Sequence, residues 1–244
     1  MMDTLRRPYG FSGVASADAA RLDEGLRAHL LGVFNYMASG VLLSAIVGWL
    51  ISATPALQAL LLGTPLKWVA MFAPLGLALL IGFRYNRLSR TAILSMFWAM
   101  SACYGVAFGT ILMVFTGESV LRAFLATSAA FAGAALLGYT TKRDLSGFGT
   151  FLFMGMIGIL VAGLLNLVIG SSMLGFVISV LAVLIFTGLT AWDMQRLKSE
   201  YVAGYGSAEF EGKAAVMGAL GLYINFMAIF MNLAQLLGVA RSEE

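Results

Sequence analysis

Long apolar runs separated by short polar segments dominate the chain. A bilayer core about 30 Å thick needs roughly 20 helical residues to span it, and seven runs are long enough. They cover residues 31–53, 67–83, 91–115, 119–140, 148–169, 173–193 and 214–239. The last three runs contain no Lys, Arg or Glu. The pattern predicts an all-α membrane protein, a bundle of seven transmembrane helices.

The first thirty residues differ from the rest, because acidic residues such as Asp18 and Asp23 leave no continuous apolar core there. A cleavable signal peptide requires such a core. We therefore predict a polar cytoplasmic tail over residues 1–30. The seven-helix transmembrane domain is predicted over residues 31–240.

The positions of the basic residues predict the orientation. With the N-terminus inside, twelve of the fifteen Lys and Arg residues fall in cytoplasmic segments: Arg6, Arg7, Arg21, Arg27, Arg84, Arg87, Arg90, Lys142, Arg143, Arg196, Lys198 and Lys213. The opposite side retains Lys67, Arg122 and Arg241. Cytoplasmic loops of membrane proteins carry an excess of Lys and Arg. We therefore predict an N-in, C-out topology.

Composition excludes a soluble protein. Of the 244 residues, 60% are hydrophobic and 11% are charged, whereas soluble domains carry about 25% charged residues. The formal net charge of +3 does not indicate nucleic-acid binding, because the basic residues lie in small clusters between apolar runs. The single cysteine, Cys103, cannot form an intrachain disulfide.

No enzyme signature is present in the sequence. A nucleophile needs a base within hydrogen-bonding reach, and the only histidine, His29, precedes the first apolar run. An aspartyl protease needs two carboxylates, and only Asp193 lies at a suitable depth. There is no metal-ligand cluster, phosphate-binding glycine loop or dinucleotide fingerprint. We expect neither catalysis nor a bound cofactor or metal.

Asp193 is the first candidate functional residue. It ends the sixth apolar run, and ionisable groups within a membrane are costly and often functional. The alternative is that Asp193 marks the cytoplasmic boundary of the membrane, where it is solvated or paired with Arg196 or Lys198. Together with Lys142 and Arg143, these two basic residues are predicted as charges on the cytoplasmic side.

Amide side chains on the seventh run form a second candidate group. Asn225, Asn232 and Gln235 are spaced by seven and three residues, so they share one helical face. This face should point into the bundle, because amides in lipid lack hydrogen-bonding partners. Asn35 and Asn166 are candidate partners on other helices. These amides either form hydrogen bonds that hold helices together or line a hydrated path.

Small residues recur on several of the predicted helices. They are Ala130, Ala134 and Gly138 on the fourth, Gly155, Gly158 and Gly163 on the fifth, and Gly218 and Gly221 on the seventh. Small residues let helix backbones approach closely within a membrane. They indicate packing within the bundle or, alternatively, a dimer face.

Two longer motifs make the chain recognisable. They are GYTTKRDLSGFG over residues 138–149 and GLTAWDMQ over residues 188–195. Together they closely resemble the Bax inhibitor (transmembrane Bax inhibitor motif) family, and its bacterial members most of all. The resemblance continues through residues 34–37 and through Leu222 and Tyr223, and so covers nearly the whole chain.

The resemblance implies a bundle whose central seventh helix is wrapped by the other six. It implies a pH-sensitive calcium leak, with calcium ions as a partner besides the lipid bilayer. The alternative is a non-conducting regulatory protein that binds membrane proteases or other membrane complexes. The bacterial-like motifs, together with the lack of a signal peptide, favour a bacterial inner membrane.

The family's proposed gate and pH sensor is a pair of aspartates, and this chain departs from it. Asp193 matches the first through its Trp-Asp-Met-Gln context. The second falls in a Leu-Tyr-Leu-Asp-Phe pattern that here reads Leu-Tyr-Ile-Asn-Phe, with Asn225 in place of the aspartate. Two close carboxylates cannot both ionise cheaply and tend to share a proton. An Asp–Asn pair keeps one hydrogen bond but loses the second titration, so we expect a blunted pH response.

Overall fold

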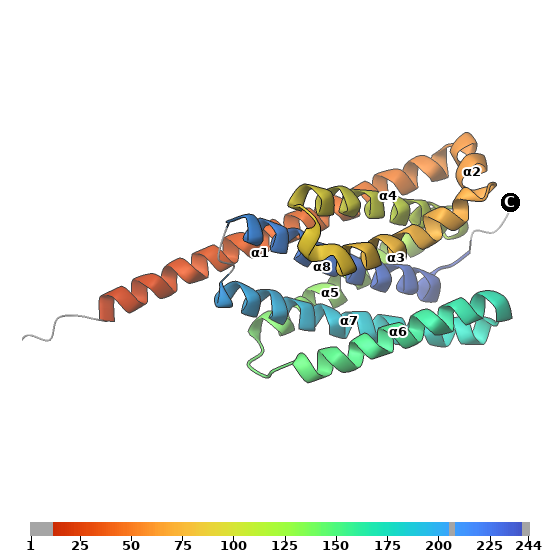
Figure 1. The fold of residues 1–244 in the computed structure, drawn as a ribbon. Coiled ribbons are helices and arrows are strands. Elements are labelled where there is room, and N and C mark those ends of the chain that lie inside the picture. The colour runs from red at the N-terminus through yellow and green to blue at the C-terminus, as the bar shows by residue number, and fades with distance from the viewer. Residues whose placement is uncertain (1–11, 205–207, 241–244) are drawn as a thin grey trace, which may run out of the picture.

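The computed structural model describes residues 12–204 and 208–240. Its helices are α1 (Ser12–Ala53), α2 (Pro55–Leu62), α3 (Leu66–Arg84), the 3₁₀ helix η1 (Tyr85–Arg87), α4 (Arg90–Val114), α5 (Gly117–Thr140), α6 (Ser146–Ile169), α7 (Ser172–Ala203) and α8 (Ala208–Leu237). Within these residues, seven helices are long and apolar enough to cross a membrane. The predicted all-α architecture with seven spans is confirmed (Figure 1).

Local sequence signals explain where several helices begin and end. The hydroxyl oxygens of Ser89 and Ser171 accept hydrogen bonds from backbone N–H groups in the first turns of α4 and α7, which is the usual role of an N-cap serine. Gly170 ends α6 in the left-handed conformation at φ 69°, where glycine has no Cβ to clash. Gly170 and Ser171 form the short turn between α6 and α7.

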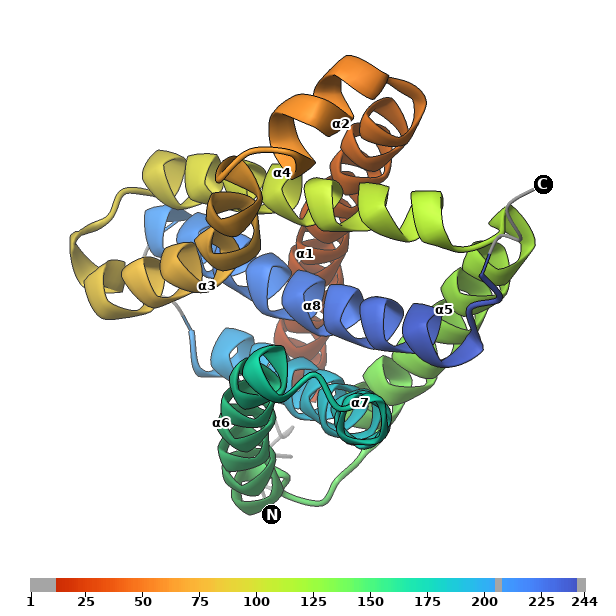
Figure 2. The ribbon, with the colours of Figure 1, turned by 90° about the vertical axis from the view of Figure 1, so that its right-hand side faces the viewer.

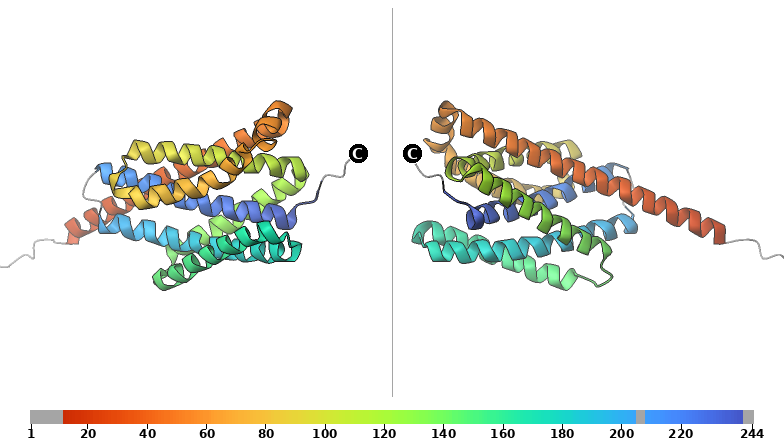
Figure 3. Two further views of the ribbon diagram at one scale, coloured as in Figure 1. Left: turned by 45° about the vertical axis from the view of Figure 1, so that its right-hand side comes forward. Right: turned by 180° about the vertical axis from the view of Figure 1, so that it is seen from behind.

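The helices extend beyond the apolar runs. α1 begins at Ser12 and α7 continues to Ala203, so most of the segment predicted as a polar tail is helical. The apolar runs are shorter than the helices because hydropathy marks only the part of a helix that lies in hydrocarbon. The helices continue beyond these runs because no proline or glycine pair interrupts them there. Leu26 and Leu30 are buried, so the bundle itself supports part of the extension. α1 continues beyond the other helices at its N-terminal end (Figure 3).

α8 lies at the centre of the bundle (Figure 2). It packs extensively against α1, α4, α5 and α7. Two thirds of its apolar window is buried, against one third or less in the other six spans. The predicted central position of the seventh span is confirmed.

The other six spans do not all wrap α8, contrary to what the resemblance implied. α3 packs mainly on α4, and α6 packs on α7, and neither makes an extensive contact with α8. Helices in lipid can remain peripheral, because bilayer chains cover their apolar side chains as well as a neighbouring helix would.

The start of α1 and the end of α8 lie at opposite ends of the bundle (Figure 1), which agrees with an odd number of crossings. The side on which each end lies stays a prediction. Arg6, Arg7 and Arg241, which contributed to the orientation argument, lie outside the described residues.

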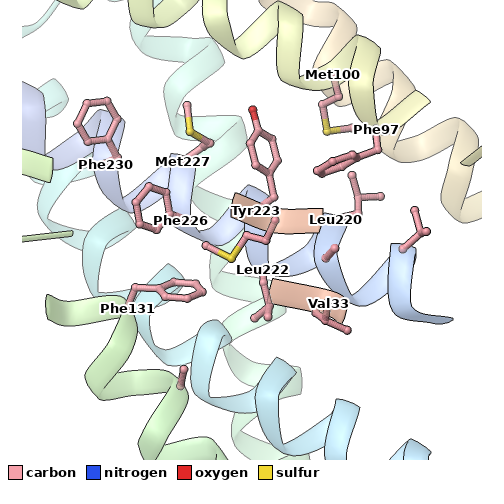
Figure 4. Packing of buried hydrophobic residues seen from close by; sticks show 14 of the residues in the cluster. Val33, Phe97, Met100, Phe131, Leu220, Leu222, Tyr223, Phe226, Met227 and Phe230 are labelled. Carbon is pink, nitrogen blue, oxygen red and sulfur yellow. The ribbon is translucent and has the colours of Figure 1, made fainter. Parts of the chain in front are cut away.

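Aromatic side chains on α8 form the centre of the core (Figure 4). Tyr223, Phe226 and Phe230 are all buried, and their spacing places them along one stripe of the helix. Tyr223 meets Phe97 edge-on at 5.4 Å between ring centroids, and Phe226 meets Phe131 at 5.5 Å. Such edge-to-face pairs add stability beyond the area they bury.

Glycines bring particular helix pairs close together. A Cβ at Gly48 of α1 would lie 3.1 Å from the Gly105 carbonyl oxygen and 3.1 Å from the Gly109 nitrogen of α4. A Cβ at Gly138 of α5 would clash with the backbone of Ala191 on α7. At Gly158 it would meet no atom within 4 Å, so not every glycine of the predicted small-residue rows serves packing within the bundle.

Candidate functional site

Asp193 and Asn225 meet where α7 packs on α8. Both side chains are buried, and Asn225 Nδ2 donates a hydrogen bond to Asp193 Oδ2 over 2.7 Å. Gly221 lies one turn before Asn225, and a Cβ there would lie 3.5 Å from Asp193 Oδ2, at ordinary van der Waals distance. The hydrogen bond expected between these two residues is confirmed.

A chain of alternating charges leads from this contact toward the end of α7. Arg196 Nη2 lies 3.6 Å from Asp193 Oδ1, and Arg196 Nε lies 3.4 Å from Glu200 Oε1. The side chain of Asp193 is 12% exposed, whereas those of Arg196 and Glu200 are 39% and 46% exposed. Because a buried carboxylate requires a partner, Arg196 provides the charge that balances Asp193.

The second predicted cation, Lys198, does not pair with Asp193. Its Nζ donates to the carbonyl oxygen of Tyr139 over 3.0 Å and lies 4.7 Å from the centre of the Tyr139 ring. Of the two salt-bridge partners considered for Asp193, only Arg196 is therefore in contact with it. Lys198 instead joins α7 to the end of α5.

The two motifs that carry the family resemblance contact each other. The side chain of Gln195 accepts a hydrogen bond from the Leu145 N–H over 2.8 Å and donates one to the Arg143 carbonyl oxygen over 2.8 Å. The backbones of Gly138 and Ala191 approach one turn away. These contacts fasten the α5–α6 loop, which carries the exposed Lys142 and Arg143, to the helix that holds Asp193.

The other amides of α8 have separate partners. Asn232 Nδ2 donates to the Ala228 carbonyl oxygen of its own helix over 2.8 Å. Gln235 Oε1 accepts from Ser179 Oγ of α7 over 3.2 Å. The three amides thus follow one side of α8, and within the described part of the chain Asn225 and Gln235 are the two that make side-chain hydrogen bonds to another helix.

The two candidate partners on other helices lie elsewhere. Asn166 Oδ1 accepts from the Ser171 N–H over 3.1 Å, and so stabilises the turn after α6. Asn35 is exposed on α1. The hydroxyl of its neighbour Tyr36 accepts a hydrogen bond from Arg90. Asn35 therefore lies near the end of the bundle at which α4 begins.

A polar contact that the sequence analysis missed joins α1, α4 and α8. Ser44 Oγ lies 2.7 Å from the Tyr223 hydroxyl and 2.8 Å from the Ser101 carbonyl oxygen. A carbonyl can only accept, so Ser44 donates to it and Tyr223 donates to Ser44. Neither residue is ionised or part of an amide row. The only sequence signal was that Ser44 lies midway between Gly40 and Gly48, in a row of small residues.

Among the described residues, no three His, Cys, Asp or Glu side chains gather where they could hold a metal ion. Asp193 is also the only carboxylate among the buried residues of this part of the chain. The arrangement can hold two helices together through one buried charge. It offers no preformed cage of several carboxylates, such as high-affinity calcium sites use.

Comparison with known proteins agrees with the motifs. The sequence pattern of the family described as "Inhibitor of apoptosis-promoting Bax1" matches residues 26–242. A Caulobacter vibrioides protein is 39% identical over 97% of this chain and 98% of its own length. The Escherichia coli inner membrane protein YbhL is 34% identical over 89% of this chain and 94% of its own.

A Streptococcus pyogenes membrane protein is 34% identical over 88% of this chain and 94% of its own length. The names of the Escherichia coli and Streptococcus pyogenes relatives, together with the seven apolar helices, support a location in a bacterial inner membrane. With the family match covering most of its length, the chain belongs to the Bax inhibitor family of integral membrane proteins.

Proposed function

We propose that the protein is a calcium leak channel whose gate is the contact between α7 and α8, and whose response to pH is blunted. The observation that carries the proposal is the buried hydrogen bond between Asp193 and Asn225. It joins the central helix to a neighbour at the two positions of the family's aspartate pair, the second of which is Asn225 in this chain. Opening this contact would separate α8 from α7 close to the charged residues Arg196 and Glu200.

The chemistry of Asn225 accounts for the blunted response. Its Nδ2 group can donate to an ionised carboxylate, and equally to the carbonyl oxygen of a neutral carboxyl group. The contact with Asp193 therefore survives a change in protonation. In a pair of aspartates the contact requires a shared proton, so loss of that proton weakens it.

The proposal is tested by calcium flux into liposomes that contain the purified protein, measured between pH 6 and pH 8. Wild type should show flux above empty liposomes with a shallow pH dependence. Asn225→Asp should steepen that dependence, because it restores the two-carboxylate pair. Asp193→Ala should remove the pH dependence that remains.

Asn232→Asp is the matched control. It adds the same group to the same helix, where Asn232 Nδ2 donates to a carbonyl oxygen of its own helix and not to Asp193, and it should leave the pH profile close to that of wild type. A steep wild-type response that Asn225→Asp does not increase would contradict the blunted gate.

The alternative is a non-conducting protein that regulates membrane proteases or other membrane complexes. The scarcity of oxygen ligands favours it, since Asp193 is the only buried carboxylate in the described residues and calcium prefers six to eight oxygen ligands. Absence of flux at every pH, in a preparation shown to be folded, would support this alternative over the channel.

A further inference from the structure

A large apolar groove lies between the two peripheral helices, α3 and α6. It encloses about 1120 Å³, which exceeds the roughly 300–1,000 Å³ of most small-molecule pockets. α3 and α4 form one wall, and α6 forms the other with single residues of α7 and α8. Because all of these helices are membrane spans, the groove lies within the bilayer.

The groove follows α3 for most of its length, from Lys67 to Phe83. At 1.5 Å per residue this distance is about 24 Å, against a hydrocarbon thickness of about 30 Å. The groove is therefore long enough for an extended acyl chain.

The only charge in the groove lies at one end. Lys67 is the one charged residue among those that line it. It lies in the first turn of α3, with Nζ 5.6 Å from the centre of the Trp68 ring. Lysine and tryptophan are both favoured at the headgroup level of a membrane. The groove thus combines a cation at the membrane surface with an apolar channel below it.

We infer that the groove binds an anionic phospholipid, with its acyl chains between α3 and α6 and its phosphate paired with Lys67. A phospholipid carries charge at one end and hydrocarbon over the rest, which matches the groove. Lysine near a membrane surface attracts anionic headgroups. The inference does not rest on ion conduction, because the groove is lined by neither Asp193 nor Asn225.

A lipid fits this groove better than a transmembrane helix of another protein does. Helices associate in membranes through small residues that allow close backbone contact. The α3 wall does include the small residues Ala78 and Gly82. The facing wall formed by α6, however, presents large side chains, including Phe153, Met156 and Leu160, which keep a helix backbone at a distance. The glycines Gly158 and Gly163 of α6 do not line the groove. Flexible methionine side chains adapt well to an irregular hydrocarbon chain.

The test is native mass spectrometry of the full-length protein in detergent, with phosphatidylglycerol and phosphatidylethanolamine added in equal amounts. Wild type should retain one phosphatidylglycerol in preference to phosphatidylethanolamine. Ala107→Phe adds a phenyl ring to the α4 wall of the groove, where it obstructs the path of an acyl chain, and it should lower the bound lipid at least tenfold. Ala132→Phe adds the same ring to an exposed position on α5 and should leave lipid binding unchanged.

Lys67→Gln tests the headgroup contact without changing the groove. The preference for phosphatidylglycerol should fall to parity, while lipid is still retained. Lys142→Gln removes the same charge from the exposed α5–α6 loop, and the preference should persist. Because Lys67 is exposed, Lys67→Gln should fold even if Ala107→Phe does not.

Equal lipid binding by wild type and by folded Ala107→Phe would overturn the proposal. An undiminished preference in Lys67→Gln would do the same. If folded Ala107→Phe instead lost a copurifying polypeptide and kept its lipid, the groove would be a protein-binding site.

Discussion

A carboxylate buried between transmembrane helices needs neighbours that replace the water it has lost. Asp193 has two such neighbours: the amide of Asn225, which lies on the adjacent helix, and the guanidinium of Arg196, which lies on its own. Only the first of these holds two helices together. The two contacts should therefore contribute differently to stability and to gating.

Replacing Asn225 by leucine should destabilise the protein more than the same change at Asn232. Asn225→Leu leaves the buried Asp193 without its donor, and an unsatisfied buried polar group costs about 1–3 kcal/mol. Asn232 bonds only to a carbonyl of its own helix, so Asn232→Leu leaves no cross-helix group unsatisfied. Thermal unfolding in detergent micelles would measure the difference. Equal losses of stability would show that the hydrogen bond between α7 and α8 contributes little.

The sequence could predict some of these contacts and not others. Asp193 and Asn225 could be paired because they occupy the two positions at which the family has its aspartate pair. Spacing alone placed Asn225, Asn232 and Gln235 on one helical face, but it does not reveal which helix faces each residue. The exposure of Asn35 could not be predicted for the same reason. The sequence shows its position along α1 but not the direction in which its side chain points. The contact between Ser44 and Tyr223 depends on three helices at once, so no local pattern indicates it.

At the scale of the helices, hydropathy located every span but underestimated several lengths. The predicted sixth run ends at residue 193, whereas α7 continues to Ala203. The additional turns carry Arg196 and Glu200, which are polar and therefore fall outside an apolar window. These turns extend the charge chain that begins at Asp193. The ends of the helices, rather than their apolar centres, thus complete the candidate site.

Close packing of α5 on α7 should depend on Gly138. A Cβ there would clash with the backbone of Ala191, two residues before Asp193, and backbone cannot move as a flexible side chain can. Gly138→Ala should destabilise the protein by about 1–3 kcal/mol, as overpacking does. It should also alter the contact between Asp193 and Asn225.

Gly133→Ala is the control, because on the same helix a Cβ at Gly133 would meet no atom within 4 Å. It should be neutral or slightly stabilising, since alanine favours helix more than glycine does. Chemical unfolding in micelles compares the two variants. A Gly138→Ala variant as stable as Gly133→Ala would mean that α5 and α7 can separate without cost.

At the scale of the whole molecule, the bundle is tight on one side and open on the other. α8 packs on four helices, while α3 and α6 each rely mainly on one neighbour. Only 11% of the α3 window and 6% of the α6 window are buried. Such loosely held helices could not be distinguished from core helices by hydropathy, because lipid and protein interior favour the same side chains. The groove between them is a consequence of this arrangement.

The charge distribution predicts that the start of α1 is cytoplasmic and that the end of α8 is on the opposite side. Alkaline phosphatase needs disulfides that form outside the cytoplasm. When it is fused to this protein after residue 244, the phosphatase should therefore be active. A fusion after Lys142 should be inactive, because the predicted topology places the α5–α6 loop in the cytoplasm. A fluorescent protein that folds only in the cytoplasm should give the reverse pattern at both positions.

The two fusion positions together test the span count as well as the orientation. They are separated by α6, α7 and α8, an odd number of crossings, so they must lie on opposite sides of the membrane. Opposite signals with the reversed sign would invert the orientation and move Asp193 to the outer side. Equal signals at both positions would contradict the seven-span bundle, because one of these three helices would then fail to cross.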